Sequence, residues 1–223
     1  MTTPFAYPRV FLVDVDNTLL DNDRIEQDLR DHLNAFFSVD ACERYWSIFE
    51  ELRRELGYAD FLGALQRYRL EHPHDPRLLR MSSFLIKYPF ADRLYPKALE
   101  VLTRLDSIAT VVIFSDGDAV FQPWKVERAG IWAAVKGRVL IYVHKEQMLD
   151  DVEDHYPAEH YFFVDDKIRL LTAVKGIWGS RVTTVFARQG HYAQDEAVVN
   201  SNPPPDQTVG RIGDLLEYKF ERE

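Results

Sequence analysis

The sequence predicts an α/β fold: a doubly wound parallel sheet that carries an inserted group of four helices. Two observations lead to this prediction. Short apolar runs rich in Val, Ile, Phe and Tyr alternate with helical patterns along most of the chain. Residues 23–90 interrupt this alternation, because they hold helical patterns and no strand candidate. Alternating strands and helices are typical of a parallel sheet covered by helices.

Five runs have the composition of buried strands, and the third of them is the weakest. In chain order they are RVFLVDVD (9–16), ATVVIFSD (109–116), RVLIYVH (138–144), HYFFVDD (160–166) and RVTTVFA (181–187). Helical patterns separate or follow them at residues 96–106, 119–129, 145–156 and 168–178. A last segment, TVGRIGDLLEYK, suggests a closing strand and helix packed on the core.

The insertion contains four sets of apolar residues at helical spacing. They begin at Ile25, Tyr45, Phe61 and Leu78, and glycine or proline residues punctuate them. We therefore predict a catalytic core of residues 1–20 and 91–223 and a helical cap domain of residues 21–90. Most aromatic residues of this cap are expected in its own core, and Cys42 is expected to serve packing.

Composition excludes several classes of protein. The chain has 223 residues, of which 46% are hydrophobic, and a formal net charge of −9. Sequence-independent nucleic-acid binding needs excess Lys and Arg, so we expect no nucleic-acid partner. The start, MTTPFAYPRV, lacks the pattern of a signal peptide, and no apolar run reaches membrane-helix length. With a single cysteine, Cys42, the chain fits a cytoplasmic protein that has no membrane partner.

Acidic residues close two of the predicted strands. Asp14 and Asp16 follow the first, and Asp165 and Asp166 follow the fourth. Parallel sheets bind ligands at the carboxyl ends of their strands, so these residues should meet at one edge. Strand periodicity points Asp14 and Asp16 the same way, and like charges this close need a cation. Oxygen ligands of this kind suit Mg²⁺.

Other polar residues close the neighbouring strands. Ser115, Asp116 and Gly117 end the second strand, and Lys145 follows the third. Taken in order, Asp14-Val-Asp16-Asn17-Thr18, Ser115, Lys145 and Asp165-Asp166 resemble the four motifs of the haloacid dehalogenase superfamily of phosphotransferases. The resemblance covers residues 9–187. The helical insertion resembles the cap of the branch that includes β-phosphoglucomutase and phosphoglycolate phosphatase.

The resemblance implies a role for each acidic residue. Asp14 would be the nucleophile that forms an aspartyl-phosphate. Asp16 would be the general acid and base, and its backbone carbonyl would ligate the metal. Asp165 and Asp166 would complete the metal site, with Asp166 nearer to direct coordination.

The remaining motif residues would bind substrate. Ser115 and the backbone around Asp116 and Gly117 would hold phosphoryl oxygens, while the Asp116 carboxylate either points away or selects a substrate hydroxyl. Lys145 would pair with the phosphoryl group and with Asp14 or Asp166, although the proline that often follows this lysine is missing. Thr18 would contact substrate or a catalytic aspartate. Lys125 is expected on a solvated helix face.

The function so implied is Mg²⁺-dependent hydrolysis of a small phosphorylated metabolite. A phosphomutase would use the same core residues. A dehalogenase is less consistent with Asp16, because a halide leaves without a proton. A non-catalytic protein that binds Mg²⁺ and phosphate is the remaining alternative. The sequence leaves the ester and the oligomeric state open.

Overall fold

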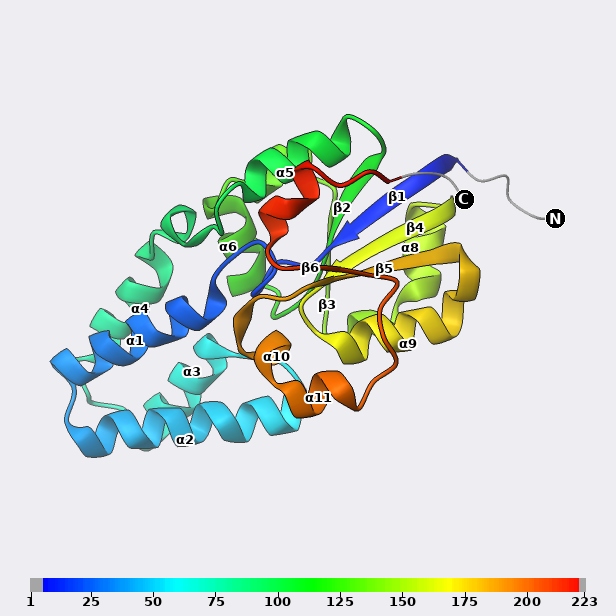
Figure 1. Ribbon diagram of the computed structural model, residues 1–223. Coiled ribbons are helices and arrows are strands. Elements are labelled where there is room, and N and C mark those ends of the chain that lie inside the picture. Colours follow the sequence, from blue (N-terminus) through cyan, green and yellow to red (C-terminus); the bar gives the residue numbers. More distant parts are fainter. Residues whose placement is uncertain (1–5, 221–223) are drawn as a thin grey trace.

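Six parallel strands form one sheet in the computed structural model, which describes residues 6–220 (Figure 1). The strands are β1 (Tyr7–Val13), β2 (Thr110–Asp116), β3 (Val139–Tyr142), β4 (Ala158–Asp165), β5 (Val182–Ala187) and β6 (Gln207–Val209). Their order is β3-β2-β1-β4-β5-β6. This is the order of a doubly wound fold, in which ligands bind where the chain reverses direction across the sheet. The predicted fold class is confirmed, and the five predicted strands are all present.

Strand register places the motif residues at one edge. Val13 of β1 pairs with Ile113 of β2 on one side and with Val164 of β4 on the other. One residue further along, Asp14 and Asp165 therefore stand beside each other at the carboxyl ends of their strands. The reversal of strand order falls between β1 and β4, so the predicted site lies at the position the topology favours.

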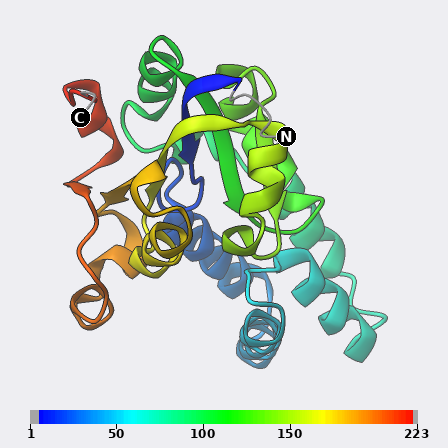
Figure 2. The same ribbon diagram turned by 90° about the vertical axis from the view of Figure 1, so that its right-hand side faces the viewer.

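Helices lie on both faces of the sheet (Figure 2). Two layers of buried apolar side chains, one on each face, join the sheet to them. Alternate residues of β1 enter different layers, as strand geometry requires: Phe11 and Val13 face one, Val10 and Leu12 the other. The first layer packs against α5 (Ala98–Asp106), α6 (Phe121–Arg128) and α7 (Ile131–Ala134). The second packs against α8 (Leu149–His155) and α9 (Ile168–Trp178).

Four helices between β1 and β2 lie together to one side of the sheet, and we call them the four-helix segment (Figure 1). They are α1 (Asn22–Phe36), α2 (Val39–Leu56), α3 (Phe61–Glu71) and α4 (Leu78–Lys87). Side chains cap three of them: Asp21, Ser38 and Asp60 accept hydrogen bonds from the first turns of α1, α2 and α3. A division into core and cap domains stays a prediction, and its outermost residues, 1–5 and 221–223, lie outside the described part.

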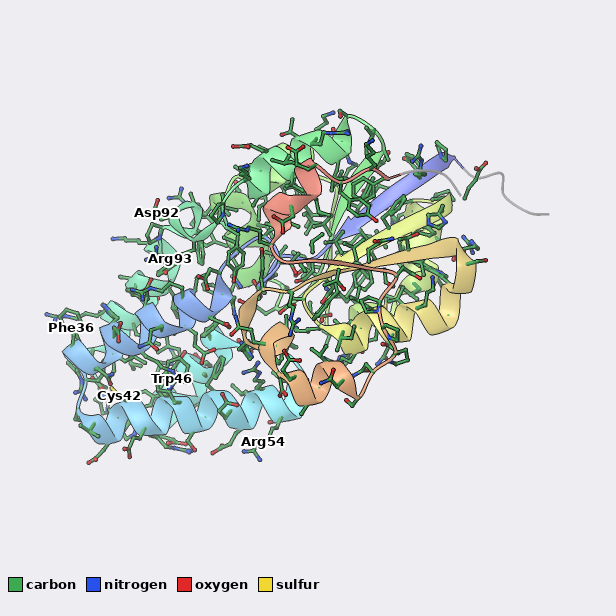
Figure 3. All side chains as sticks on the ribbon, in the orientation of Figure 1. Phe36, Cys42, Trp46, Arg54, Asp92 and Arg93 are labelled. Carbon is green, nitrogen blue, oxygen red and sulfur yellow. The ribbon has the colours of Figure 1, made fainter. Side chains whose placement is uncertain are left out.

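The interior of the four-helix segment is aromatic, as predicted. Tyr45, Trp46, Phe49, Phe61 and Tyr68 are buried, and so is Cys42. Tyr58, expected in the same core, is only half-buried. Trp46 lies on the side of α2 that faces α1, whereas Arg54 points away from the helices into solvent (Figure 3).

Two connections join the four-helix segment to the sheet, and they run side by side. Leu20 and Leu94 form an antiparallel bridge. The Asp21 amide donates to the Arg93 carbonyl at 2.8 Å, and the Tyr95 amide donates to the Leu19 carbonyl at 2.9 Å. The short 3₁₀ helix η1 (Phe90–Arg93) belongs to the second connection. These backbone hydrogen bonds hold the two connections to each other.

The chain after β5 is more helical than the sequence predicts. Two short helices, α10 (Gly190–Gln194) and α11 (Glu196–Asn200), precede β6, and η4 (Ile212–Leu216) follows it. The predicted closing strand and helix correspond to β6 and η4. Two further 3₁₀ turns are η2 (Lys145–Gln147) and η3 (Gly179–Arg181).

Across residues 6–220, every helix is too short or too polar to cross a membrane.

Candidate active site

Asp14, the predicted nucleophile, lies directly after β1 and is 4% exposed. Its Oδ1 accepts a hydrogen bond from Lys145 Nζ at 2.6 Å. Its Oδ2 is buried and has no hydrogen-bond partner in the described part of the chain. Burial raises the pKa of Asp14 from 3.8 to about 6, although the neighbouring Lys145 ammonium lowers it. One oxygen of this carboxylate is thus fixed and the other is open to a ligand.

Lys145 begins η2, just beyond β3, and its side chain is buried. Besides Asp14, its ammonium contacts the Phe114 carbonyl at 3.0 Å and Asp165 Oδ2 at 2.7 Å. Burial lowers the pKa of Lys145, but the carboxylates of Asp14 and Asp165 outweigh it and raise that pKa above its usual range. The expected pairing with Asp14 is confirmed. The second acidic partner is Asp165, where Asp166 was the predicted alternative, and η2 itself lies against β2 and α9.

Asp14, Asp165 and Asp166 form a buried cluster whose ligand oxygens lie within 4.8 Å of one another. Asp165 is partly engaged, since its Oδ1 accepts from the Lys167 amide at 2.7 Å. Asp166 differs, because neither of its oxygens has a hydrogen-bond partner among residues 6–220. Burial raises the pKa of Asp166 strongly, and the charges of Asp165 and Asp14 raise it further.

This cluster could bind a metal ion. Among the described residues, one ammonium contacts this cluster: Lys145 pairs with Asp14 and Asp165, and not with Asp166. Buried carboxylate oxygens without partners are unfavourable unless a cation or a proton reaches them. Asp14 Oδ2 and both Asp166 oxygens are such atoms, and they offer the hard oxygen ligands that suit Mg²⁺. The residues present therefore fit a divalent cation.

Asp16 turns away from this cluster. Its two oxygens accept hydrogen bonds from Lys125 Nζ at 2.8 and 3.0 Å. The expectation that one cation serves four carboxylates is wrong for this side chain. The chain leaves β1 at Val13, so strand alternation no longer governs the direction of Asp16. Its side chain is 25% exposed, and its predicted metal contact through the backbone carbonyl stays a prediction.

Lys125 is the clearest error of the sequence prediction. Expected on a solvated face of α6, it is 1% exposed. It lies on the buried stripe of that helix, which consists of Phe121, Gln122, Lys125 and Val126. Two polar residues within an apolar stripe at helical spacing are a signal that sequence reasoning could have used. A buried ammonium needs a charged partner, and Asp16 is that partner.

Ser115 and Gln122 form a second polar contact on this side of the site. Gln122 Nε2 donates to Ser115 Oγ at 2.9 Å, and both side chains are buried. Gly117 makes room for this contact, because a Cβ there would lie 2.6 Å from the Gln122 Cβ. The motif serine is thus fixed by a glutamine that the sequence reasoning did not identify.

Asp116 holds the backbone of Lys145. Its Oδ1 accepts from the Lys145 amide at 2.7 Å, and burial raises the pKa of Asp116. Neither predicted role of this carboxylate, pointing away or selecting a substrate hydroxyl, describes this contact. Asp116 instead joins the end of β2 to η2 and so helps to place the Lys145 ammonium.

The turn after β1 is held by the loop after β5. Asn17 takes the left-handed conformation, with φ at 59°, which Asn tolerates. Gly190 approaches it so closely that a Cβ there would lie 2.5 Å from the Asn17 Cβ. Thr18 is fully buried, and Gln189 Nε2 donates to its carbonyl at 3.0 Å. The Thr18 hydroxyl has no partner in the described chain, and its expected contact with substrate stays a prediction.

Comparison with known proteins adds a relative of high similarity. No family model and no curated protein sequence matches the chain. The crystal structure of a haloacid dehalogenase-like hydrolase from Burkholderia xenovorans LB400 shares 61% sequence identity, with a TM-score of 0.91. The match covers 96% of this chain and 99% of the other.

Two more distant structures share the fold. The L-2-haloacid dehalogenase from Xanthobacter autotrophicus, with chloropropionic acid covalently bound, is 18% identical with a TM-score of 0.59. The HAD-hydrolase YfnB from Bacillus subtilis, bound to magnesium, is 18% identical with a TM-score of 0.58. Each match covers 94% of this chain and 97% of the other. Together with the motif residues at the sheet edge, the 61% identity over nearly the whole length shows that the chain belongs to the haloacid dehalogenase-like hydrolases.

Proposed function

We propose that this hydrolase is a Mg²⁺-dependent phosphatase that acts on a small phosphate monoester. The observation that carries the proposal is the buried cluster of Asp14, Asp165 and Asp166, with carboxylate oxygens that lack partners within residues 6–220. A phosphate dianion must approach the anionic nucleophile, and it is repelled unless cations offset both charges. Lys145 supplies one positive charge, and the free oxygens suit a divalent ion that supplies more.

Asp16 supports phosphoryl transfer over dehalogenation. The alkoxide that leaves a phosphate monoester needs a proton, whereas a halide does not. A carboxyl group two residues after the nucleophile and partly exposed to solvent can donate that proton. This difference in leaving group is the chemical reason for proposing a phosphatase within a family whose solved structures include dehalogenases.

The proposed reaction has two steps. In the first, an Asp14 oxygen bonds to phosphorus while the ester oxygen leaves and takes a proton from Asp16. In the second, water gives a proton to Asp16 and attacks phosphorus, which releases inorganic phosphate and restores the Asp14 carboxylate. Mg²⁺ held by Asp14, Asp165 and Asp166 would neutralise charge on the phosphoryl group.

The other motif residues bind the phosphoryl group in this proposal. Lys145 is buried beside Asp14 and would pair with a phosphoryl oxygen while it orients the nucleophile. Ser115 has its hydroxyl oxygen fixed by Gln122, and its proton, which is donated to the Asp116 carbonyl at 3.3 Å, would turn to a second phosphoryl oxygen. A fixed donor such as the Lys145 ammonium stabilises a transition state without reorganising during the reaction.

The test is release of phosphate from a panel of phosphate monoesters, with Mg²⁺ and with excess chelator. The nucleophile variant is Asp14→Asn. The matched control is Asp92→Asn, the same change at an exposed residue of η1 on the outside of the molecule (Figure 3). We expect release that requires Mg²⁺, persists in Asp92→Asn and is lost in Asp14→Asn.

The contrary outcomes identify the alternatives. Halide release from 2-haloacids without phosphate release would replace the proposal with a dehalogenase. Transfer of phosphate between two positions of a sugar, with no free phosphate, would replace it with a phosphomutase. Binding of Mg²⁺ without turnover of any ester or haloacid would leave a non-catalytic binding role.

A further inference from the structure

We propose that Lys125 is a positioning residue that holds the general acid Asp16 and ties it to the first turn of the four-helix segment. The proposal rests on the role of Asp16 in the proposed function. It goes beyond that role because it assigns Asp16 a fixed partner, and because it connects proton transfer with the position of helices outside the sheet.

The Lys125 ammonium is fully occupied by three hydrogen bonds. Two go to the oxygens of Asp16, at 2.8 and 3.0 Å, and the third goes to Asn22 Oδ1 at 3.0 Å. An ammonium has three donors and no acceptor, so each donor has found an oxygen. Lys125 is buried, and it lies 109 positions from Asp16 and 103 from Asn22 in the sequence. Through these hydrogen bonds its buried side chain joins three segments that are far apart in the sequence or belong to different elements.

Asn22 is the first residue of α1, so one arm of this contact belongs to the four-helix segment. It lies in the first connection to the sheet, beside the paired backbone of Asp21 and Arg93. A shift of α1 relative to the sheet would change the distance between Asn22 and Lys125. Because the same ammonium bonds Asp16, this change would also shift the hydrogen bonds that orient Asp16.

The helix that carries Lys125 has further contacts with the four-helix segment and its second connection. The Phe121 ring packs against the rings of Phe61 and Phe90, with centroids 5.7 and 5.6 Å apart. Trp124 Nε1 donates to the Ile86 carbonyl at 2.9 Å. Figure 1 shows α6 on the side of the sheet that faces these helices. The α6 helix therefore contacts the four-helix segment and its second connection through Trp124 and Phe121, and the centroid of the Phe121 ring also lies 5.7 Å from the Lys125 ammonium.

The inner side of α6 contacts the site at two places. Gln122 fixes Ser115, and Lys125 fixes Asp16. A phosphoryl-binding residue and the acid are thus both oriented by one helix on which the four-helix segment rests. The arrangement places Asp16 correctly when the helices are docked as described. Without Lys125, Asp16 would keep its position in the chain and lose its fixed orientation.

The leaving group of the substrate distinguishes positioning from general damage. An alkyl phosphate has a poor leaving group that depends on a proton from Asp16. The nitrophenolate of p-nitrophenyl phosphate leaves with little help. We use kcat/KM, which reports the steps up to departure of the leaving group and leaves out the second step that the two esters share. We expect Lys125→Met to lower kcat/KM on an alkyl phosphate roughly 10–100-fold, and on p-nitrophenyl phosphate by less than about threefold. Lys125→Arg, which keeps a cation, should recover part of the loss.

A second measurement does not depend on turnover. Hydrogen exchange of the α1 backbone should be faster in Lys125→Met, by about tenfold in the first turn, because Asn22 loses its anchor. Asn22→Ala should cause the same faster exchange while the Lys125 contact with Asp16 remains. The matched control is Lys175→Met, which removes an ammonium bonded to Asp206 and to the Val182 carbonyl and should leave both readouts unchanged. If Lys125→Met fails to fold, Lys125→Arg carries the comparison of the two esters, and Asn22→Ala carries the measurement of hydrogen exchange.

An equal loss of kcat/KM on the two esters would show a structural role and overturn the proposal. Unchanged exchange in α1 would overturn the connection to the four-helix segment. Failure of the proposed function is visible separately, because the wild-type protein would then release no phosphate from either ester. In that case Asp16 protonates no leaving group and the positioning role falls with it, even if exchange in α1 responds.

Discussion

Replacing the proposed nucleophile should stabilise the metal-free protein. Asp14 is almost fully buried, and its pKa is raised from 3.8 to about 6 by burial. Near neutral pH its ionised form is therefore less favourable in the folded chain than in the unfolded chain. A difference of about two pKa units corresponds to about 3 kcal/mol. Asp14→Asn removes the charge and nearly keeps the shape, and the buried Lys145 ammonium keeps Asp165 as its charged partner. We therefore expect the free energy of unfolding to rise by up to that amount.

The gain should depend on pH in a defined direction. Because the folded pKa of Asp14 lies above the unfolded value of 3.8, the folded chain binds this proton more tightly. The contribution of Asp14 to stability is present in full below about pH 4 and is lost as pH rises through about 6. The advantage of Asp14→Asn should therefore be largest at about pH 8 and should vanish near about pH 4.

Urea unfolding in excess chelator at these two pH values measures the effect. For a chain of this length a gain of about 3 kcal/mol also raises the melting temperature by roughly 6–12 °C. Asp92→Asn, an exposed control, should change neither quantity. The reasoning is refuted if Asp14→Asn is less stable than the wild type at about pH 8, or if its gain is the same at both pH values.

Three further predictions concern the same site. Lys145→Met removes the ammonium that contacts Asp14 and Asp165. The free energy of unfolding, measured in chelator, should fall by about 3–5 kcal/mol, and a variant as stable as the wild type would contradict this. Mg²⁺ at about 100 times its dissociation constant should stabilise the wild type against thermal unfolding by about 2.7 kcal/mol. Asp166→Asn should gain less, and an equal gain would exclude Asp166 as a ligand. Gly117→Ala places a Cβ 2.6 Å from the Gln122 Cβ, so kcat for phosphate release should fall roughly tenfold, and unchanged turnover would show that this close approach is not needed.

Local patterns were sufficient to predict the sheet. The strand candidates at residues 9–16 and 160–166 correspond to β1 and β4, because continuous buried apolar runs are characteristic of parallel strands. Parallel strands also bring their carboxyl ends to one edge. Asp14 and Asp165 could therefore be predicted to meet before any contact was known. The helices α10 and α11 were not predicted, since each has only five residues and shows little periodicity.

The partners of charged side chains could not be predicted in the same way. Lys145 was expected near Asp14 or Asp166, and it pairs with Asp14 and Asp165. Lys125 was expected in solvent, and it is buried against Asp16. A charged residue on a helix is ordinarily solvated, so composition alone favours the exposed interpretation.

The sequence by itself determined the order of the strands along the chain, their buried character and the acidic residues at their ends. These features follow from periodicity within a few residues and from the geometry of parallel sheets. Only the tertiary structure decided that Asp14 and Asp16 pair with different lysines, and that no described residue bonds either oxygen of Asp166. The physical reason is distance along the chain. Lys125 and Asp16 are 109 positions apart, and their contact exists because α6 packs beside the end of β1.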